Sequence, residues 1–222
     1  MSILKSNYET ILSKISAAAK GRPVTLVAVS KSQPVEKIIE LYKLGHRDFG
    51  ENYAQELHEK IILLDEKGIK DIRWHFIGHL QTNKVRSIIP RVFCIHSVDS
   101  DKLIKEISKR VAEAERPPVA CFVEVNLSSE QNKSGVIANL VPGLVKTLND
   151  LDGVGICGLM CIPNPDRKDK SSDFKKLKEL ALVSIGPKPF LSMGMSDDYE
   201  VAIENGSTHV RIGTALFGER ES

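Results

Sequence analysis

The sequence predicts a closed (β/α)8 barrel of the TIM type, because eight short apolar runs alternate with amphipathic stretches along almost the whole chain. Strands that alternate with helices pair in parallel, and eight of them can close on themselves without leaving a sheet edge. The alternative is an open, doubly wound sheet. However, the first apolar run is not followed by the Gly-x-Gly-x-x-Gly sequence that is typical of dinucleotide-binding sheets.

A helix is expected before the barrel, because apolar residues recur at helical spacing from Ile3 to Ile15. We therefore expect one domain over residues 1–222, with an N-terminal helix over 1–20 and a barrel over 24–218. The expected strands begin at Val24, Asp48, Arg73, Val92, Val119, Val154, Phe190 and His209. The expected helices between them cover residues 35–44, 54–64, 82–88, 101–114, 138–148, 173–183 and 197–204.

Several helix starts support this order of elements. Pro34 suits the first turn of a helix, where the missing N–H group is not needed. Ser100 and Ser196 are each followed by an aspartate, and a negative charge is favourable at the positive end of the helix dipole. Each of these starts follows an expected strand, as a barrel requires.

Composition narrows the classes of partner. The 31 Lys and Arg residues nearly balance the 29 Asp and Glu residues, which argues against the nucleic-acid backbone as the main partner. No apolar run approaches the roughly 20 residues needed to cross a bilayer. The four cysteines form no Cys-x-x-Cys pair and lie in apolar runs, so we expect reduced core residues. These features predict a cytoplasmic protein without a nucleic-acid or membrane partner.

Two cations at strand ends require an explanation. Lys31 follows the first strand on the same side as Val29, and alternation along a barrel strand directs that side to the interior. On the last strand, Val210 and Ile212 suit the apolar helix layer, which directs Arg211 inward. Closure brings the last strand beside the first, so we expect Lys31 and Arg211 to meet at the mouth formed by the carboxyl ends.

This pairing predicts a reactive amine. Two neighbouring cations in a partly dry site disfavour each other's charge, so Lys31 would be uncharged often enough to attack a carbonyl and form a Schiff base. For either residue alone, the simpler explanation is a lysine that reaches solvent or an arginine paired with a carboxylate. Their combination on adjacent strands favours a functional site.

The loops after the last two strands suit a phosphate group, which barrels frequently bind there. The seventh strand is followed by Gly194 and Ser196, and the eighth by Gly213 and Thr214. Glycine permits close backbone approach, and hydroxyl and main-chain N–H groups at a helix start can donate to an anion. A lysine, a phosphate cradle and an inward arginine together indicate pyridoxal phosphate.

An arginine at the pyridine nitrogen would limit the chemistry of this cofactor. Enzymes that need a full electron sink usually place a carboxylate there, which keeps the nitrogen protonated. Arg211 can only donate a hydrogen bond and cannot accept the proton, so the nitrogen would stay neutral. The electron sink is then weakened, and we expect little or no catalysis.

A series of short motifs runs through almost the whole chain. They are residues 27–31 (Val-Ala-Val-Ser-Lys), 49–53 (Phe-Gly-Glu-Asn-Tyr), 74–78 (Trp-His-Phe-Ile-Gly), 80–81 (Leu-Gln), 83–84 (Asn-Lys), 133–135 (Lys-Ser-Gly), 158–160 (Gly-Leu-Met), 192–196 (Ser-Met-Gly-Met-Ser) and 210–213 (Val-Arg-Ile-Gly). In this order they make the chain similar to the pyridoxal phosphate homeostasis protein family, also called the proline synthase co-transcribed homologue family. The resemblance implies a fold similar to the barrel domain of alanine racemase.

The resemblance also assigns cofactor contacts. It implies six cofactor-binding residues: Lys31, Asn52, Ser196, Arg211, Gly213 and Thr214. Lys31 would carry the cofactor as a Schiff base, Arg211 would face the pyridine nitrogen and Asn52 would lie near the ring, while the other three would hold the phosphate. The family implies a role in vitamin B6 homeostasis inside the cell, with apo-enzymes as candidate recipients. We expect a monomer or a weak dimer.

Two enzymatic alternatives stay open. A weak amino-acid racemase needs a second acid or base on the ring face opposite the lysine. Alanine racemase takes a tyrosine from an additional domain of its partner subunit, and we expect no such domain because the sequence ends nine residues after Gly213. Only Tyr53 lies beside a candidate cofactor residue, and helix packing explains it more simply. The other alternative is a phosphosugar enzyme that uses Lys31 as aldolases use their lysine.

The remaining histidines and basic residues in recognisable positions do not require a catalytic or metal-binding role. His75 and His79 lie on an expected strand and the loop after it rather than on one helical face, so we expect no metal site. The strand pattern predicts that His75 lines the barrel mouth. Residues 162–170 are expected to form a mobile loop with a solvated basic face. Lys84 and Lys133 receive no role beyond a positive potential that attracts a phosphorylated aldehyde.

Overall fold

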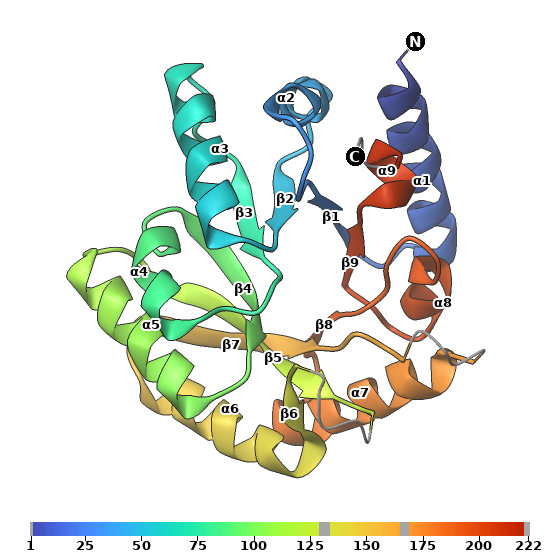
Figure 1. Cartoon of the computed structure of the whole chain (residues 1–222). Coiled ribbons are helices and arrows are strands. Elements are labelled where there is room, and N and C mark those ends of the chain that lie inside the picture. The colour runs from blue at the N-terminus through green and yellow to red at the C-terminus, as the bar shows by residue number, and fades with distance from the viewer. Residues whose placement is uncertain (1, 129–133, 165–168, 220–222) are drawn as a thin grey trace.

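The computed structural model confirms the closed barrel (Figure 1), and it describes residues 2–128, 134–164 and 169–219. The strands of the barrel are β1 (Thr25–Val29), β2 (Asp48–Glu51), β3 (Arg73–Phe76), β4 (Val92–Val98), β5 (Val119–Asn126), β7 (Val154–Met160), β8 (Phe190–Ser192) and β9 (His209–Ile212). Each pairs in parallel with the next, and the pairing of β9 with β1 closes the ring. A two-residue strand, β6 (Val136–Ile137), pairs with β5 outside the ring.

Helices surround the ring of strands (Figure 1). They are α1 (Ile3–Ala19), α2 (Val35–Lys43), α3 (Ala54–Glu66), α4 (Val85–Ile88), α5 (Asp101–Glu113), α6 (Val141–Asp150), α7 (Ser171–Ser184), α8 (Tyr199–Glu204) and α9 (Thr214–Phe217). Short 3-10 turns, η1 (Thr82–Lys84) and η2 (Ala138–Leu140), precede α4 and α6. The expected order of strands and helices is therefore confirmed, while β6 and α9 were not expected.

Strand alternation divides the side chains as the sequence predicts. Leu26 and Ala28 of β1 belong to the large apolar core between the strands and the helices. Val27 and Val29 lie outside that core, and a Cβ on Gly50 of β2 would come within 2.9 Å of the Val27 side chain. Buried apolar side chains of this kind each stabilise the fold by about 1.5–3 kcal/mol. The odd-numbered side of β1 therefore faces the barrel interior.

The two expected serine helix starts have different outcomes. The Ser100 hydroxyl accepts a hydrogen bond from the N–H of Leu103 at 3.4 Å and caps α5, as expected. The start at Ser196 was wrong, because α8 begins only at Tyr199. The carboxylate of Asp198 accepts a hydrogen bond from the N–H of Met195 at 2.7 Å, which keeps the residues before α8 in a turn.

Helix α1 packs against α8 and α9, so the first and the last helix of the described chain lie side by side (Figure 1). The Asn7 side-chain amide donates to the backbone oxygen of Leu216 in α9 at 3.2 Å. These contacts support the loops that follow β8 and β9. The four cysteines are free thiols. Within the described ranges, no helix combines the length and the apolar character that crossing a membrane requires.

Candidate functional site

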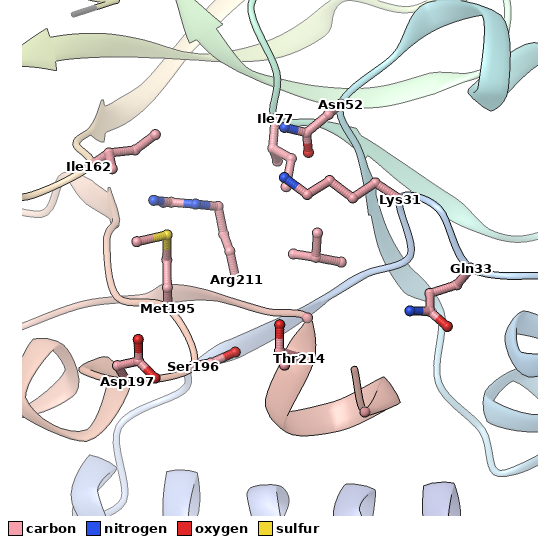
Figure 2. Close-up of a pocket in the computed structure, with 13 residues that line it drawn as sticks. Lys31, Gln33, Asn52, Ile77, Ile162, Met195, Ser196, Asp197, Arg211 and Thr214 are labelled. Atoms are coloured by element: carbon pink, nitrogen blue, oxygen red, sulfur yellow. The ribbon is translucent and has the colours of Figure 1, made fainter. Parts of the chain in front are cut away.

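A cavity of about 280 Å³ opens at the carboxyl ends of β1 and β9 (Figure 2). This volume is close to the lower end of the range for small-molecule sites, about 300–1,000 Å³. All six residues expected to bind the cofactor line it: Lys31, Asn52, Ser196, Arg211, Gly213 and Thr214. The fold thus brings together residues from both ends of the chain, and their contact with a cofactor stays a prediction.

Lys31 enters the cavity from a turn that follows β1. Its side chain is half-buried and extends toward Asn52 and Ile77 in Figure 2. The next residue, Ser32, has a φ of 57°, in the left-handed region that residues other than glycine rarely adopt. Such a backbone persists only when its surroundings fix it, so neighbouring contacts must hold the Lys31 turn in place.

A buried ion-pair network supplies those contacts. The Lys60 ammonium, on α3, donates to Glu51 Oε1 at 2.8 Å, to Glu56 Oε1 at 2.7 Å and to the backbone oxygen of Ser30 at 2.6 Å. The Ser30 hydroxyl donates to the same Glu51 oxygen at 2.6 Å. Burial raises the pKa of Glu51, and the Lys60 charge opposes that shift. The four residues form one connected cluster under the mouth of the barrel.

This cluster holds two candidate cofactor residues through the backbone. Ser30 precedes Lys31, and the N–H of Ser32 donates to Glu56 Oε1 at 2.6 Å. Glu51 in turn precedes Asn52. The sequence reasoning missed the cluster, although one signal was available. Lys60 lies on the buried face of α3, where a charged residue needs a partner.

Arg211 faces the barrel interior, as strand alternation predicts. It lies opposite Val27 of β1 in the sheet register and is only 5% exposed. Its Nη1 donates to Ser192 Oγ at 2.7 Å, and its Nη2 donates to the backbone oxygen of Cys161 at 3.0 Å. Burial lowers the pKa of Arg211 from its ordinary value. Figure 2 shows the guanidinium directed into the same cavity as Lys31.

The two loops expected to hold phosphate meet beside Arg211. Gly194 has a φ of 96°, and a Cβ there would lie 2.6 Å from the Cβ of Ala202, so only glycine fits. The backbone oxygen of Gly194 accepts from the N–H of Arg211 at 3.0 Å. The Ser196 hydroxyl accepts from the N–H of Ala215, at the start of α9, at 3.3 Å. Hydroxyl and backbone donors of both loops therefore border one end of the cavity.

Asn52 contributes an acceptor that has no partner. Its Oδ1 is buried, and within the described residues it forms no hydrogen bond. Gly78 packs so closely that a Cβ there would lie 2.3 Å from the backbone oxygen of Asn52. Asn52 also borders a second cavity of about 300 Å³, which it shares with Tyr53, His79 and Lys84. Lys84 thus lies near the mouth of the barrel.

Some expectations were wrong or lie beyond the described residues. His75 does not line the mouth but a cavity at the amino ends of the strands, because alternation gives the side of a strand and not the depth. Lys170 is not part of a solvated face, since it forms an ion pair with the buried Asp198 at 3.0 Å. Lys133, and residues 165–168 of the basic loop, lie outside the described residues.

The sequence reasoning also missed part of the cavity wall. The further lining residues are Val29, Gln33, Ile77, Ile162, Met195, Asp197 and Gly218. Ile77 lies within a motif that was recognised and Asp197 directly follows one, so their place in the sequence was a usable signal. Ile162 gave no such signal, because its loop carries no recognisable pattern.

Comparisons with known proteins identify the family of this chain. Residues 2–221 match the family model described as the alanine racemase N-terminal domain. A curated relative from Schizosaccharomyces pombe, named pyridoxal phosphate homeostasis protein, is 39% identical over 228 aligned residues, which cover 99% of this chain and 94% of the relative. The chain belongs to the pyridoxal phosphate homeostasis protein family. The resemblance noted in the sequence is therefore confirmed.

Solved structures extend the comparison. PipY from Synechococcus elongatus, solved with PLP bound, has a TM-score of 0.82 and 31% identity, with 94% of this chain and 100% of PipY covered. Alanine racemase from Streptomyces lavendulae has a TM-score of 0.71 at 17% identity, with 99% of this chain covering 57% of the racemase. At this low identity, the likeness to alanine racemase shows a shared barrel fold and carries no conclusion about function.

Proposed function

We propose that this chain binds pyridoxal phosphate in the cavity at the carboxyl ends of the strands. It holds the cofactor covalently but reversibly through Lys31, and it serves cofactor homeostasis in the cytoplasm without strong catalytic activity. The observation that carries this proposal is one cavity that joins the Lys31 amine, the Arg211 guanidinium and the two hydroxyl-bearing loops. The name of the family and the PLP bound to PipY support it.

The residues present fit the functional groups of this cofactor. Lys31 offers the amine that an aldehyde needs, and Ser196 and Thr214 offer hydroxyl groups to a phosphate. Arg211 offers donors to a ring nitrogen. The buried Asn52 Oδ1, which has no partner within the described residues, offers an acceptor to a ring hydroxyl. A buried polar atom without a partner costs about 1–3 kcal/mol, so a ligand that donates to it gains affinity.

When bound, pyridoxal phosphate supplies an aldehyde that condenses with a primary amine to form a Schiff base and water. Lys31 provides that amine, and the Lys60 cluster holds its turn so that the side chain stays directed into the cavity. Arg211 donates a hydrogen bond and cannot take up a proton, so it favours an unprotonated ring nitrogen. These residues retain a bound cofactor but provide little driving force for carbanion chemistry.

The ionisable groups at the cavity favour a carrier over a racemase. Within the described chain, the ionisable residues that line the cavity are Lys31, Asp197 and Arg211. None of the described residues that line it is a tyrosine. Racemisation needs a second acid or base besides the lysine. The competing function, a weak amino-acid racemase, would have to use Asp197, which is exposed. We therefore propose delivery to apo-enzymes as the role of the bound cofactor.

Absorbance during a titration with pyridoxal phosphate tests the binding mode. We expect the wild-type chain to develop the yellow band of a lysine-bound cofactor, and Lys31→Ala to abolish it. Lys43→Ala removes an exposed lysine of α2 and is the matched control, which should keep the band. A band of undiminished intensity in Lys31→Ala would contradict the proposal.

Proton exchange in deuterated water separates the carrier from the racemase. The loaded protein is incubated with amino acids, and loss of the α-proton is followed by NMR. We expect no exchange beyond the rate given by free pyridoxal phosphate at the same concentration. Exchange well above that rate, and its loss in Asp197→Asn, would instead establish the racemase.

A further inference from the structure

A cavity of about 460 Å³ lies at the amino ends of the strands, at the opposite end of the barrel from the cavity that contains Lys31. It is the larger of the two, and the two share no described lining residue. Its volume falls within the range of small-molecule sites, about 300–1,000 Å³. This amino-end cavity is therefore a separate opening that is large enough for a ligand.

Two β-bulges border the amino-end cavity. The register of β4 against β3 shifts at Phe93, which is the extra residue of the first bulge. The register of β7 against β5 shifts at Cys157 in the same way. Both extra residues line the cavity. A bulge re-aims a side chain, and bulges are frequent at the rims of barrels and next to active sites.

Three phenylalanines form the aromatic part of the cavity wall. Phe122 is buried, whereas Phe93 and Phe190 are half-exposed. The ring centroids of Phe122 and Phe190 lie 5.1 Å and 5.5 Å from that of His209, in both cases edge to face. Aromatic rings interact favourably at such distances. Phenylalanine rings gathered around one cavity favour a flat aromatic ligand.

Two hydrogen-bonding groups lie side by side on the same wall. Thr25 of β1 and His209 of β9 are partners in the sheet register, and alternation directs both inward, together with Val27 and Arg211. The Thr208 hydroxyl lies 2.9 Å from His209 Nδ1, so Nε2 is the ring nitrogen left for a ligand. Within the described ranges, neither this Nε2 nor the Thr25 hydroxyl forms a hydrogen bond.

The charges at the amino-end cavity are already paired. Arg73 Nε donates to Asp48 Oδ1 at 2.7 Å, and His75 Nε2 lies 3.0 Å from the same oxygen. Burial opposes the ionisation of Asp48, but these hydrogen bonds hold its pKa well below its usual range. Burial lowers the pKa of His209 to about 4 and raises that of the Cys94 thiol, so both are uncharged at pH 7. An ionised ligand would therefore meet no unpaired counter-charge on the described part of the wall.

We propose that the amino-end cavity is a second small-molecule site, which takes an uncharged aromatic molecule with one hydrogen-bonding substituent. The ring packs among Phe93, Phe122 and Phe190, and the substituent bonds to Thr25 and His209. A hydroxyl group suits this pair, because it can donate to one partner and accept from the other. Binding here uses no residue of the Lys31 cavity, so it does not rest on the proposed function.

NMR titration of the 15N-labelled chain with 2-naphthol tests the site. This probe is a flat aromatic alcohol that is uncharged at pH 7, naphthalene lacks its hydroxyl, and 2-naphthoate carries a negative charge. We expect saturable shifts of amide signals at the amino ends of β1 and β9. The affinity for 2-naphthol should exceed that for naphthalene about two- to tenfold, the scale of one neutral hydrogen bond. The absence of saturable shifts, or tighter binding of 2-naphthoate than of 2-naphthol, would overturn the proposal.

Thr25→Val tests the polar part of the wall. Valine is close to threonine in size and lacks the hydroxyl, so the preference for 2-naphthol over naphthalene should fall at least twofold. The matched control is Thr10→Val, which removes a hydroxyl bonded to the backbone oxygen of Ser6 on α1, and it should keep the wild-type preference. An undiminished preference in Thr25→Val would contradict the proposed contact.

Phe190→Ala tests the aromatic part of the wall. Both 2-naphthol and naphthalene should bind about two- to tenfold more weakly, the scale of one aromatic pair. Leu182→Ala removes a partly exposed apolar side chain of α7 outside the cavity and is the control. Equal affinities in the two variants would place the probes elsewhere and overturn the proposal.

Competition with pyridoxal phosphate separates the two cavities. A saturating concentration should leave the affinity for 2-naphthol unchanged within twofold, because the cavities share no described lining residue. Displacement of 2-naphthol would place it in the Lys31 cavity and refute a second site. The other titrations contain no cofactor, so a failure of the proposed function would leave their results unchanged.

Discussion

Lys31 and Arg211 lie 180 positions apart in the chain, and closure of the barrel alone makes their strands neighbours. Alternation along β9 directs Arg211 inward, whereas Lys31 enters the same cavity from the turn that follows β1. The placement of Arg211 could be predicted from the order of strands and from parity, and that of Lys31 from its position just after the first strand. The partners of Arg211, Ser192 and Cys161, could not, because they follow from depth along the barrel axis.

Arg211→Gln should loosen the cofactor and leave the fold largely intact. Glutamine keeps a donor but removes the charge, and one hydrogen bond to a charged group contributes about 1.5–3 kcal/mol. We expect the affinity for pyridoxal phosphate to fall about 10- to 100-fold, measured by absorbance titration, with a cooperative thermal transition preserved. Arg86→Gln, at an exposed site on α4, is the control. Unchanged affinity in Arg211→Gln would show that the guanidinium does not touch the cofactor.

Glu124 should make the stability depend on pH. Burial raises its pKa from 4.5 to about 7, the neighbouring Asp99 adds to the shift, and Arg211 opposes it. Between these two values the unfolded chain has lost the proton that the folded chain keeps, so the free energy of unfolding falls as the pH rises. The loss amounts to about 3 kcal/mol.

Urea unfolding at a series of pH values measures this effect. Relative to Glu124→Gln, wild type should lose stability from about pH 4.5 to pH 7, and Glu113→Gln, at an exposed site on α5, should follow wild type. Parallel curves for wild type and Glu124→Gln would contradict a raised pKa at this position.

At the scale of single elements, the sequence predicts strands better than helix starts. Strand β5 begins at Val119 and β7 at Val154, as expected, because a buried parallel strand is a compact apolar run with a sharp boundary. Helix α8 begins two residues after the expected Asp197, because the Asp198 carboxylate holds a turn there. Helix α9 has four residues, too few for a helical period to show in the sequence.

The Lys60 cluster is a part of the site that could not be predicted from the sequence. Periodicity predicts the apolar positions of α3, and a lysine among them looks like an interruption. Its partner Glu51 lies on β2, and only the packing of α3 against the barrel brings the two charges to 2.8 Å. Charged contacts between elements depend on that packing and have no periodic signature.

Lys60→Met should destabilise the fold strongly. Removing one partner leaves a buried carboxylate without its counter-charge, which costs about 3–5 kcal/mol. The control is Lys14→Met, which breaks an exposed ion pair with Glu200 and should cost no more than about 1 kcal/mol. Chemical denaturation compares the two, and equal losses would contradict a structural role for the cluster. Adding Glu51→Gln to Lys60→Met should recover part of the loss.

At the scale of the whole molecule, the barrel separates two openings that share one interior. The mouth at the carboxyl ends carries the Lys31 cavity, and the amino ends carry the histidine-lined cavity. Helix α1 packs on α8 and α9, so the N-terminal helix supports the loops that follow β8 and β9 rather than standing apart from the barrel (Figure 1). The extent of the domain, residues 1–222, and the oligomeric state, a monomer or a weak dimer, stay predictions.

The most direct measurement is chemical trapping of the bond between Lys31 and the cofactor. The protein is loaded with pyridoxal phosphate, reduced with borohydride, digested, and mapped by mass spectrometry. We expect the added mass on the peptide that contains Lys31, and wild-type labelling to disappear in Lys31→Ala. A label on a different lysine, or a loaded protein that acquires none, would contradict the central claim.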